Sequence, residues 1–353
     1  MGDVAVVGFA QAPNVRRTHG TTNGVEMLVP IFQELYAATG LTNRDISFWC
    51  SGSSDYLAGR AFSFISAIDA IGAFPPITES HVEMDAAWAL YEAWVKIKLG
   101  EADTALVYGF GKSSAGDLRR VLAMQLDPYV AAPLWPDSVA LAGLQARLGI
   151  ESGRWSEREM AEVAARSRSD AMNNPHAQLS GHVDVDELLA APYLADPLRM
   201  HDCAPITDGA SAVILASAER ARELCENPAW ITGIEHRVDS PAIGTRDLLA
   251  SASTTASARA AGGVDGVTAA ELHAPFSHQQ ILLREAIGLN GQTTVNPSGG
   301  VLAGNPMFSA GLSRIGEAAS RVMRGQDQKV LGHATSGPLL QQNLICVMEG
   351  RDS

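Results

Sequence analysis

Two carboxylate side chains, Glu83 and Asp85, directly precede a predicted amphipathic helix in the segment HVEMDAAWALYEAWVKIKLGEADTALVYGFG, residues 81–111. In an α/β protein the start of such a helix faces a crevice at the strand ends, where a nucleophile is expected. Residues 81–99, however, contain neither Cys nor Ser. A carboxylate at this position can act as a general base, or it can simply cap the helix N-terminus. Both roles remain open for Glu83 and Asp85.

Two further polar residues stand in short motifs that are typical of catalytic loops. His273 lies in ELHAPF, and an imidazole can take a proton near neutral pH or stabilise an oxyanion. Asn305 lies in GNP, where its amide can orient a substrate or merely form a turn. His278 and His333 are additional candidates, and a hydrogen-bonded structural histidine is the alternative reading for all three histidines.

Strands alternate with helices along most of the chain, which predicts the α/β class with a parallel sheet covered on both faces. The pattern strand, turn, long helix, Gly and strand occurs at 77–114 and again at 293–337. This repetition predicts a duplicated α/β unit, with the two halves at 1–220 and 221–353. Residues 112–205 interrupt the pattern and are predicted to form an inserted cap.

Composition narrows the possible functions. The chain has 353 residues, of which 46% are hydrophobic, and a formal net charge of −13, which argues against nucleic acid as the main partner. No run approaches the roughly 20 apolar residues of a membrane span, and no signal peptide is visible, so we expect a soluble cytoplasmic protein. The four cysteines lack metal-ligand spacing, so we expect no metal site.

Four motifs together resemble the thiolase superfamily over nearly the whole chain, in particular its sterol-carrier-type and lipid-transfer-type members. They are NNPHAQ, DCAPITDGASAVILAS, ELHAPFSHQQILLREAIGL and VNPSGG followed by GNP. The resemblance implies a duplicated five-layered αβαβα sandwich with an inserted cap (loop) domain. It also implies a CoA thioester substrate, and dimerisation through central strands.

The resemblance also implies four catalytic loops, and in this chain their usual residues are largely replaced. An ungapped count puts Glu83 at the position of the nucleophilic cysteine. His273 matches the oxyanion-hole loop, Asn305 replaces the activating histidine of GHP, and Gly337 occupies the position of the second cysteine. Because an acyl-cysteine intermediate needs a thiolate, we expect no standard thiolase activity.

The resemblance suggests how CoA would bind. Arg166 and Arg168 lie in the predicted cap, where thiolases hold the CoA phosphates, although a solvated helix face is the alternative. Ser298, Gly299 and Gly300 could let the backbone approach the pantetheine arm, or could serve packing. We expect no permanently bound cofactor, since CoA enters as part of the substrate.

Two functions fit these residues best. The first is retro-aldol cleavage of a β-hydroxyacyl-CoA, such as a CoA-linked steroid side chain, with Glu83 or His273 as the base. In related lipid-transfer-type proteins this reaction involves a small OB-fold partner with a zinc ribbon. The second is a non-catalytic or regulatory subunit paired with another thiolase-like chain, and a lipid-CoA carrier is a third possibility.

Overall fold

The computed structural model describes residues 2–19, 24–58 and 61–351. Ten of its strands form one continuous path of neighbours in a single sheet, and this path divides into two sections of the same topology. The N-terminal section has the order β1 (Val4–Gln11), β7 (Ile206–Ser217), β4 (Thr104–Lys112), β2 (Phe48–Gly52) and β3 (Glu79–Val82). The C-terminal section has the order β8 (Ala229–Val238), β13 (Gln342–Glu349), β12 (Lys329–Ser336), β9 (Ala269–Glu271) and β10 (Thr294–Val295).

Strand directions repeat as well as strand order. β2 is parallel to β3 and β4, just as β9 is parallel to β10 and β12. β7 is antiparallel to β4 and β1, just as β13 is antiparallel to β12 and β8. The two sections meet where β1 pairs with β8. The predicted duplication is therefore present in the topology.

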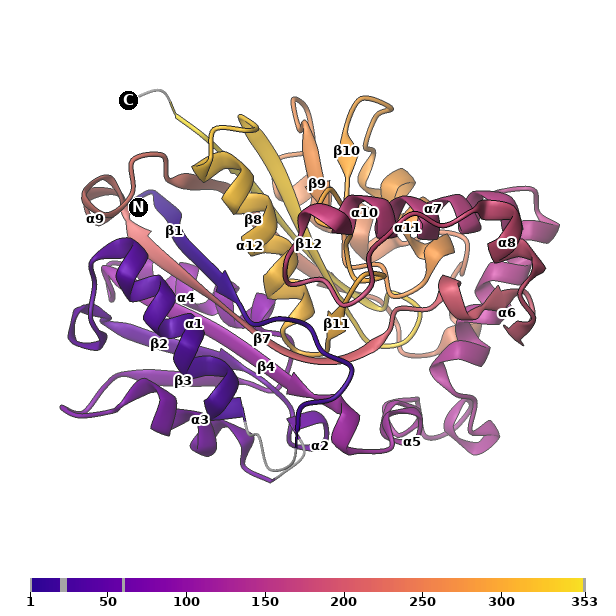
Figure 1. Ribbon diagram of the computed structural model, residues 1–353, viewed down its shortest axis with the longest axis horizontal. Coiled ribbons are helices and arrows are strands. Elements are labelled where there is room, and N and C mark those ends of the chain that lie inside the picture. The colour runs from indigo at the N-terminus through magenta and orange to yellow at the C-terminus, as the bar shows by residue number, and fades with distance from the viewer. Residues whose placement is uncertain (1, 20–23, 59–60, 352–353) are drawn as a thin grey trace.

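Five layers follow from the packing of helices on the two sections (Figure 1). The central layer consists of α4 (Ala86–Lys98) and α12 (Ala310–Met323), whose buried residues share one apolar cluster with strands of both sections. The N-terminal section is covered on its other side by α1 (Gly24–Thr39) and α3 (Ser63–Ile71). The C-terminal section is covered by α10 (Ala252–Ala260) and α11 (Ser277–Ile287). The predicted αβαβα sandwich is confirmed.

The segment between β4 and β7 forms the insertion, and Figure 1 shows much of it on one side of the molecule. Its elements are α5 (Leu118–Ala123), α6 (Ser138–Glu151), α7 (Glu157–Asp170), α8 (Val185–Ala190), β5 (Tyr193–Ala195) and β6 (Leu198–Arg199). The remaining elements are the short α2 (Asp55–Ala58), α9 (Ala218–Leu224) and β11 (Asn305–Pro306), which pairs with β7. Parts of α6 and α7 pack on the C-terminal section through Ala142 and Met160.

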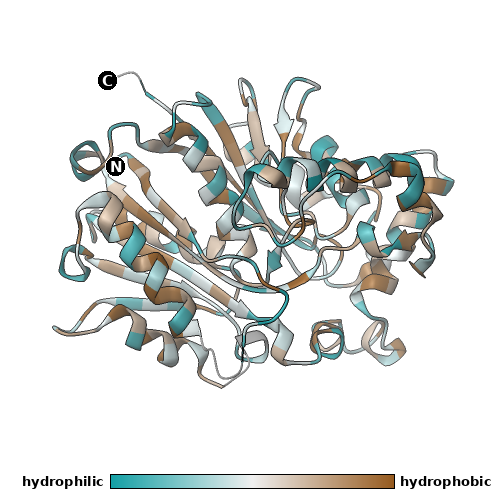
Figure 2. Ribbon diagram, viewed as in Figure 1, coloured by the Kyte–Doolittle hydropathy of each residue, from teal (hydrophilic) through white to brown (hydrophobic). Residues whose placement is uncertain are grey.

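Apolar residues concentrate along the strands, as Figure 2 shows, which is the pattern of a sheet buried on both faces. Among the described residues, no helix has the length and apolar character needed to cross a membrane. No group of three or more His, Cys, Asp and Glu side chains is arranged to hold a metal ion in the described ranges.

Candidate active site

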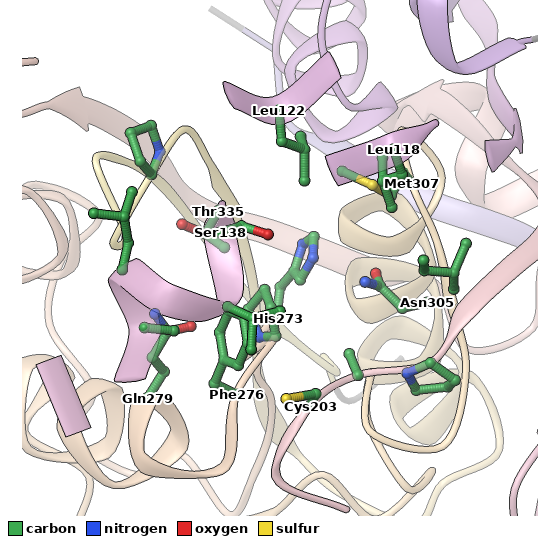
Figure 3. A pocket seen from close by; sticks show the side chains of 18 of the residues that line it. Leu118, Leu122, Ser138, Cys203, His273, Phe276, Gln279, Asn305, Met307 and Thr335 are labelled. Atoms are coloured by element: carbon green, nitrogen blue, oxygen red, sulfur yellow. The ribbon is translucent and has the colours of Figure 1, made fainter. Parts of the chain in front are cut away.

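A cavity of about 700 Å³ lies where the insertion meets the two halves of the sandwich (Figure 3). Residues of α5 and α6 form one part of its wall, and the loops around β11 and after β12 form another. Most of its lining is apolar and includes Leu118, Leu122, Val139, Phe276, Met307 and Leu340. Within this lining, Asp85, His273, Asn305 and Gly337 come from the four loops that the resemblance identified.

Asp85 joins the N-termini of the two central helices. Its Oδ1 accepts hydrogen bonds from the backbone N–H groups of Ala87 in α4 and Leu312 in α12, at 2.9 and 3.0 Å. Its Oδ2 accepts one from Gly311 at 2.9 Å. Burial raises the pKa of the Asp85 carboxyl above its ordinary value, while the three N–H donors act in the opposite direction. One carboxylate thus caps a helix from each half of the duplication.

Three accepted hydrogen bonds do not saturate this carboxylate. Two carboxylate oxygens offer about four lone-pair positions, and Oδ2 accepts only one of the backbone bonds. Asp85 is also the only acidic residue on the cavity wall within the described chain. It is therefore a carboxylate that can receive one further proton donor from the cavity.

His273 is a neutral imidazole on the cavity wall. Only 7% of the residue is exposed, and burial lowers the pKa of His273 to about 3, with His333 and Arg314 acting in the same direction. The ring therefore carries no charge at neutral pH. Its Nδ1 is buried without a hydrogen-bond partner among the described residues. A neutral imidazole held in this way can donate a hydrogen bond to a developing oxyanion.

Asn305 begins β11, which pairs with the start of β7 and so holds the GNP loop against the cavity. Its Oδ1 is buried and has no hydrogen-bond partner in the described structure. The Nδ2 group is the hydrogen-bond donor that this side chain can offer. Figure 3 shows the Asn305 and His273 side chains near the middle of the group of lining residues.

The predicted position of Glu83 in the crevice is wrong. Its side chain is 61% exposed and lies 3.6 Å from Nε2 of His81, and it does not line the cavity. After β3 ends at Val82, a tight turn follows in which Met84 N–H donates to the Val82 carbonyl. α4 begins only at Ala86, so the residue at the helix start is Asp85. Asp85 therefore stands at the helix start, where the ungapped count puts Glu83.

The expectation that Ser298, Gly299 and Gly300 contact the ligand also finds no support in their positions, because none lines the cavity. Ser298 donates through its backbone N–H and its hydroxyl to Glu271, at 2.9 and 2.8 Å. Glu271 forms a buried ion pair with Arg314 at 2.6 Å. These residues consequently belong to a buried polar network beneath the site.

The two adjacent glycines make close packing possible. Gly299 has φ +93°, and a Cβ added there would lie 2.6 Å from the Cβ of Ala171. Gly300 has φ +62°, and a Cβ added there would lie 2.6 Å from the Nδ2 atom of Asn296. Both positions favour glycine because of backbone conformation and lack of space.

Of the two arginines predicted to bind the CoA phosphates, only one reaches the cavity. Arg168 lines the cavity, whereas Arg166 is exposed and does not. Arg16 and Arg119, which sequence reasoning did not identify, also line the cavity. No short motif marks these two positions, since they come from different segments that meet only after folding.

Cys203 is a second residue that the sequence did not indicate, and Figure 3 shows it among the lining side chains. Burial raises the pKa of its thiol to about 12, and nearby Asp202 acts in the same direction. The thiol is therefore protonated at neutral pH, in contrast to an activated cysteine.

The fold is thiolase-like, and comparisons with known proteins agree. No protein-family model matches the chain. It is 29% identical over 290 residues to an acetyl-CoA acetyltransferase of Methanothermobacter thermautotrophicus, covering 72% of this chain and 73% of that protein. It is 25% identical over 283 residues to sterol carrier protein 2 of Rattus norvegicus, covering 68% of this chain and 51% of that protein.

A solved structure gives the same answer for the fold. The Ltp2-ChsH2(DUF35) aldolase matches with a TM-score of 0.82 at 18% identity, covering 100% of this chain and 99% of that chain. The chain is thus similar to proteins of the thiolase superfamily in sequence and in fold. Within that superfamily it is similar to the sterol-carrier and lipid-transfer members, as the motifs predicted. The match spans about half the length of sterol carrier protein 2.

Proposed function

We propose that this chain cleaves a carbon–carbon bond in a β-hydroxyacyl-CoA by a retro-aldol reaction. The observation that carries the proposal is the grouping of one carboxylate, Asp85, with the amide of Asn305 and the neutral imidazole of His273 around one apolar cavity. The names of two similar proteins, an acetyl-CoA acetyltransferase and a sterol carrier protein, suggest a ligand that combines CoA with a lipid. A structural neighbour is titled an aldolase.

The reaction needs a base and an oxyanion site but no covalent intermediate. Oδ2 of Asp85 takes the proton of the β-hydroxyl group, the Cα–Cβ bond breaks, and the β-carbon becomes the carbonyl of an aldehyde or ketone. The electron pair of the broken bond forms the enolate of the remaining thioester. Asn305 and His273 donate hydrogen bonds to the enolate oxygen. The α-carbon then takes the proton that Asp85 received, which gives the shortened acyl-CoA and restores the carboxylate.

The rest of the cavity fits a large lipophilic acyl group joined to CoA. The cavity of about 700 Å³, with its mostly apolar wall, would hold a group such as a steroid with its side chain. Arg16, Arg119 and Arg168 would attract the CoA phosphates to the same cavity. We also propose a dimer with a thiolase-like chain, together with an OB-fold and zinc-ribbon partner, since the neighbouring aldolase structure names a DUF35 component.

Single-turnover cleavage of a β-hydroxyacyl-CoA, with any copurifying partner present, tests the residue roles. Asp85→Asn should lower the cleavage rate about 10²–10⁴-fold, and His273→Ala about 10²–10³-fold, with little change in affinity for the ester. His273→Asn should be faster than His273→Ala, because asparagine restores a hydrogen-bond donor without a titratable ring.

Glu83→Gln is the matched control, since it makes the same carboxylate-to-amide change at an exposed position outside the cavity. It should leave the rate unchanged. A strong loss with Glu83→Gln, or wild-type rates with both Asp85→Asn and His273→Ala, would overturn these assignments. Thermal unfolding of each variant separates loss of a base from loss of the helix cap.

One observation favours a second function, that of a non-catalytic or regulatory subunit. Capping of two helices is by itself a sufficient structural reason for a carboxylate at position 85. Mass spectrometry of the purified complex distinguishes the two functions. A cysteine-bearing thiolase homologue copurifying in equal amount, with wild-type cleavage by the Asp85→Asn complex, would support the subunit role.

A further inference from the structure

Three buried side chains form a small hydrogen-bond network beside the cavity. They are Gln145 of α6 and the consecutive His278 and Gln279 of α11, with exposures of 1%, 0% and 2%. The Oε1 and Nε2 atoms of Gln145 are not interchangeable here, because each has its own hydrogen-bond partners. Gln145 Oε1 lies 3.0 Å from His278 Nε2 and 3.0 Å from Gln279 Nε2.

The orientation of each group follows from one backbone contact. Gln145 Nε2 donates to the carbonyl of Leu248 at 2.8 Å, so Gln145 Oε1 must face the other two side chains. An amide oxygen only accepts, so Gln279 donates to it through Nε2, and His278 through a protonated Nε2. Gln279 Oε1 is then left pointing elsewhere, buried and without a partner in the described part of the chain.

Gln279 belongs to the cavity wall, whose lining also includes the apolar side chains of Phe276 and Val139. Figure 3 shows Gln279 and Asn305 on opposite sides of His273. A buried acceptor left without a donor costs the free energy of its desolvation. Its rotation to find another partner is prevented by Gln145, whose own amide is held by Leu248.

We propose that Gln279 Oε1 accepts a hydrogen bond from a hydroxyl group on the acyl part of the ligand, remote from the thioester. Gln279 is on this view a specificity-determining residue that selects hydroxylated over unsubstituted acyl groups. The inference rests on the proposed function, because it assumes that a CoA-linked acyl group enters this cavity. A site that provides a hydrogen-bond acceptor for a substrate hydroxyl disfavours the analogue that lacks it.

Binding of uncleavable thioethers tests this selection apart from catalysis. Calorimetric titration would compare octyl-, decyl- and dodecyl-CoA thioethers with the same compounds carrying a terminal hydroxyl group. At one chain length the hydroxyl compound should bind roughly five- to tenfold more tightly, the gain expected from one net hydrogen bond. Equal or weaker binding of every hydroxyl compound would overturn the role of Gln279 alone. Failure of all the thioethers to bind would overturn the CoA-ester function and this inference with it.

Gln279→Met keeps the length of the side chain but cannot accept this bond, so it should abolish the preference for the hydroxyl compound. Gln280→Met is the matched control on the same helix. Gln280 Oε1 already accepts from Asn296 at 2.7 Å, and Gln280 does not line the cavity. The control should retain the wild-type preference, and a preference retained by Gln279→Met would also overturn the proposal.

Discussion

At the scale of single residues, the cavity contains a thiol that is not an activated nucleophile. Cys203 lies on the wall, yet burial raises its pKa to about 12. A thiolate is the reactive form of cysteine, and it forms readily only where positive charge or a helix N-terminus lowers the pKa. The two helix N-termini at this site are instead occupied by the carboxylate of Asp85.

Cys203→Ser should therefore keep cleavage of a β-hydroxyacyl-CoA within about tenfold of the wild-type rate, since serine preserves the size of the side chain and no thiolate is used. The measurement is single-turnover cleavage with the partner present. A loss similar to that of an acyl-cysteine enzyme, or rapid inactivation of the folded protein by iodoacetamide through Cys203, would contradict this expectation.

At the scale of secondary-structure elements, the N-terminus of α12 must approach Asp85 closely. A Cβ added at Gly311 would lie 2.6 Å from Asp85 Oδ1 and 2.6 Å from the Cβ of Ala334. Neither atom can move freely, because Asp85 holds α4 and Ala334 lies in β12. Glycine at this position thus permits the contact between the two central helices.

Gly311→Ala should lower the free energy of unfolding by about 1–3 kcal/mol, the usual cost of overpacking in a buried region. Urea unfolding followed by circular dichroism measures the change. Gly291→Ala is the control, since an added Cβ there meets no atom within 4 Å. Equal stabilities of the two variants would show that the helix ends are not in close contact.

At the scale of the whole molecule, three buried histidines make stability depend on pH. Burial lowers the pKa values of His273 and His278 to about 3 and that of His333 to about 4. In the unfolded chain these residues titrate near 6.5. Between these pKa values the unfolded chain binds more protons than the folded protein. The free energy of unfolding therefore falls as the pH falls. Asp85 and Glu271, whose pKa values are raised by burial, act in the opposite direction.

The variant His278→Gln tests the contribution of His278 to the pH dependence of stability. Glutamine keeps a hydrogen-bond donor for Gln145 but cannot be protonated. The melting temperature of the wild type should fall more steeply than that of the variant as pH is lowered from 6.5 toward 4. Differential scanning calorimetry across this range provides the comparison. Parallel curves of melting temperature against pH would indicate that His278 is protonated as readily in the folded protein as in the unfolded chain, which would contradict its lowered pKa.

The architecture was predictable because the repeated strand, turn and helix pattern extends over long segments. His273 and Asn305 were also found from local motifs, and both line the cavity. Glu83 was misplaced because a turn of two residues is invisible to an ungapped count, and the sequence left the capping role open between Glu83 and Asp85. Arg16, Cys203 and Gln279 were missed, because their proximity depends on tertiary packing and no local pattern reports it.

The hydrogen bond between Asp85 and Gly311 joins residues 226 positions apart, and this separation affects how the chain reaches its native state. During synthesis the first half emerges while α12 is still missing, so the apolar face of α4 has no partner there. Contacts over such separations form slowly, and exposed apolar surface promotes aggregation in the meantime. We therefore expect the nascent N-terminal half to depend on chaperones until α12 docks.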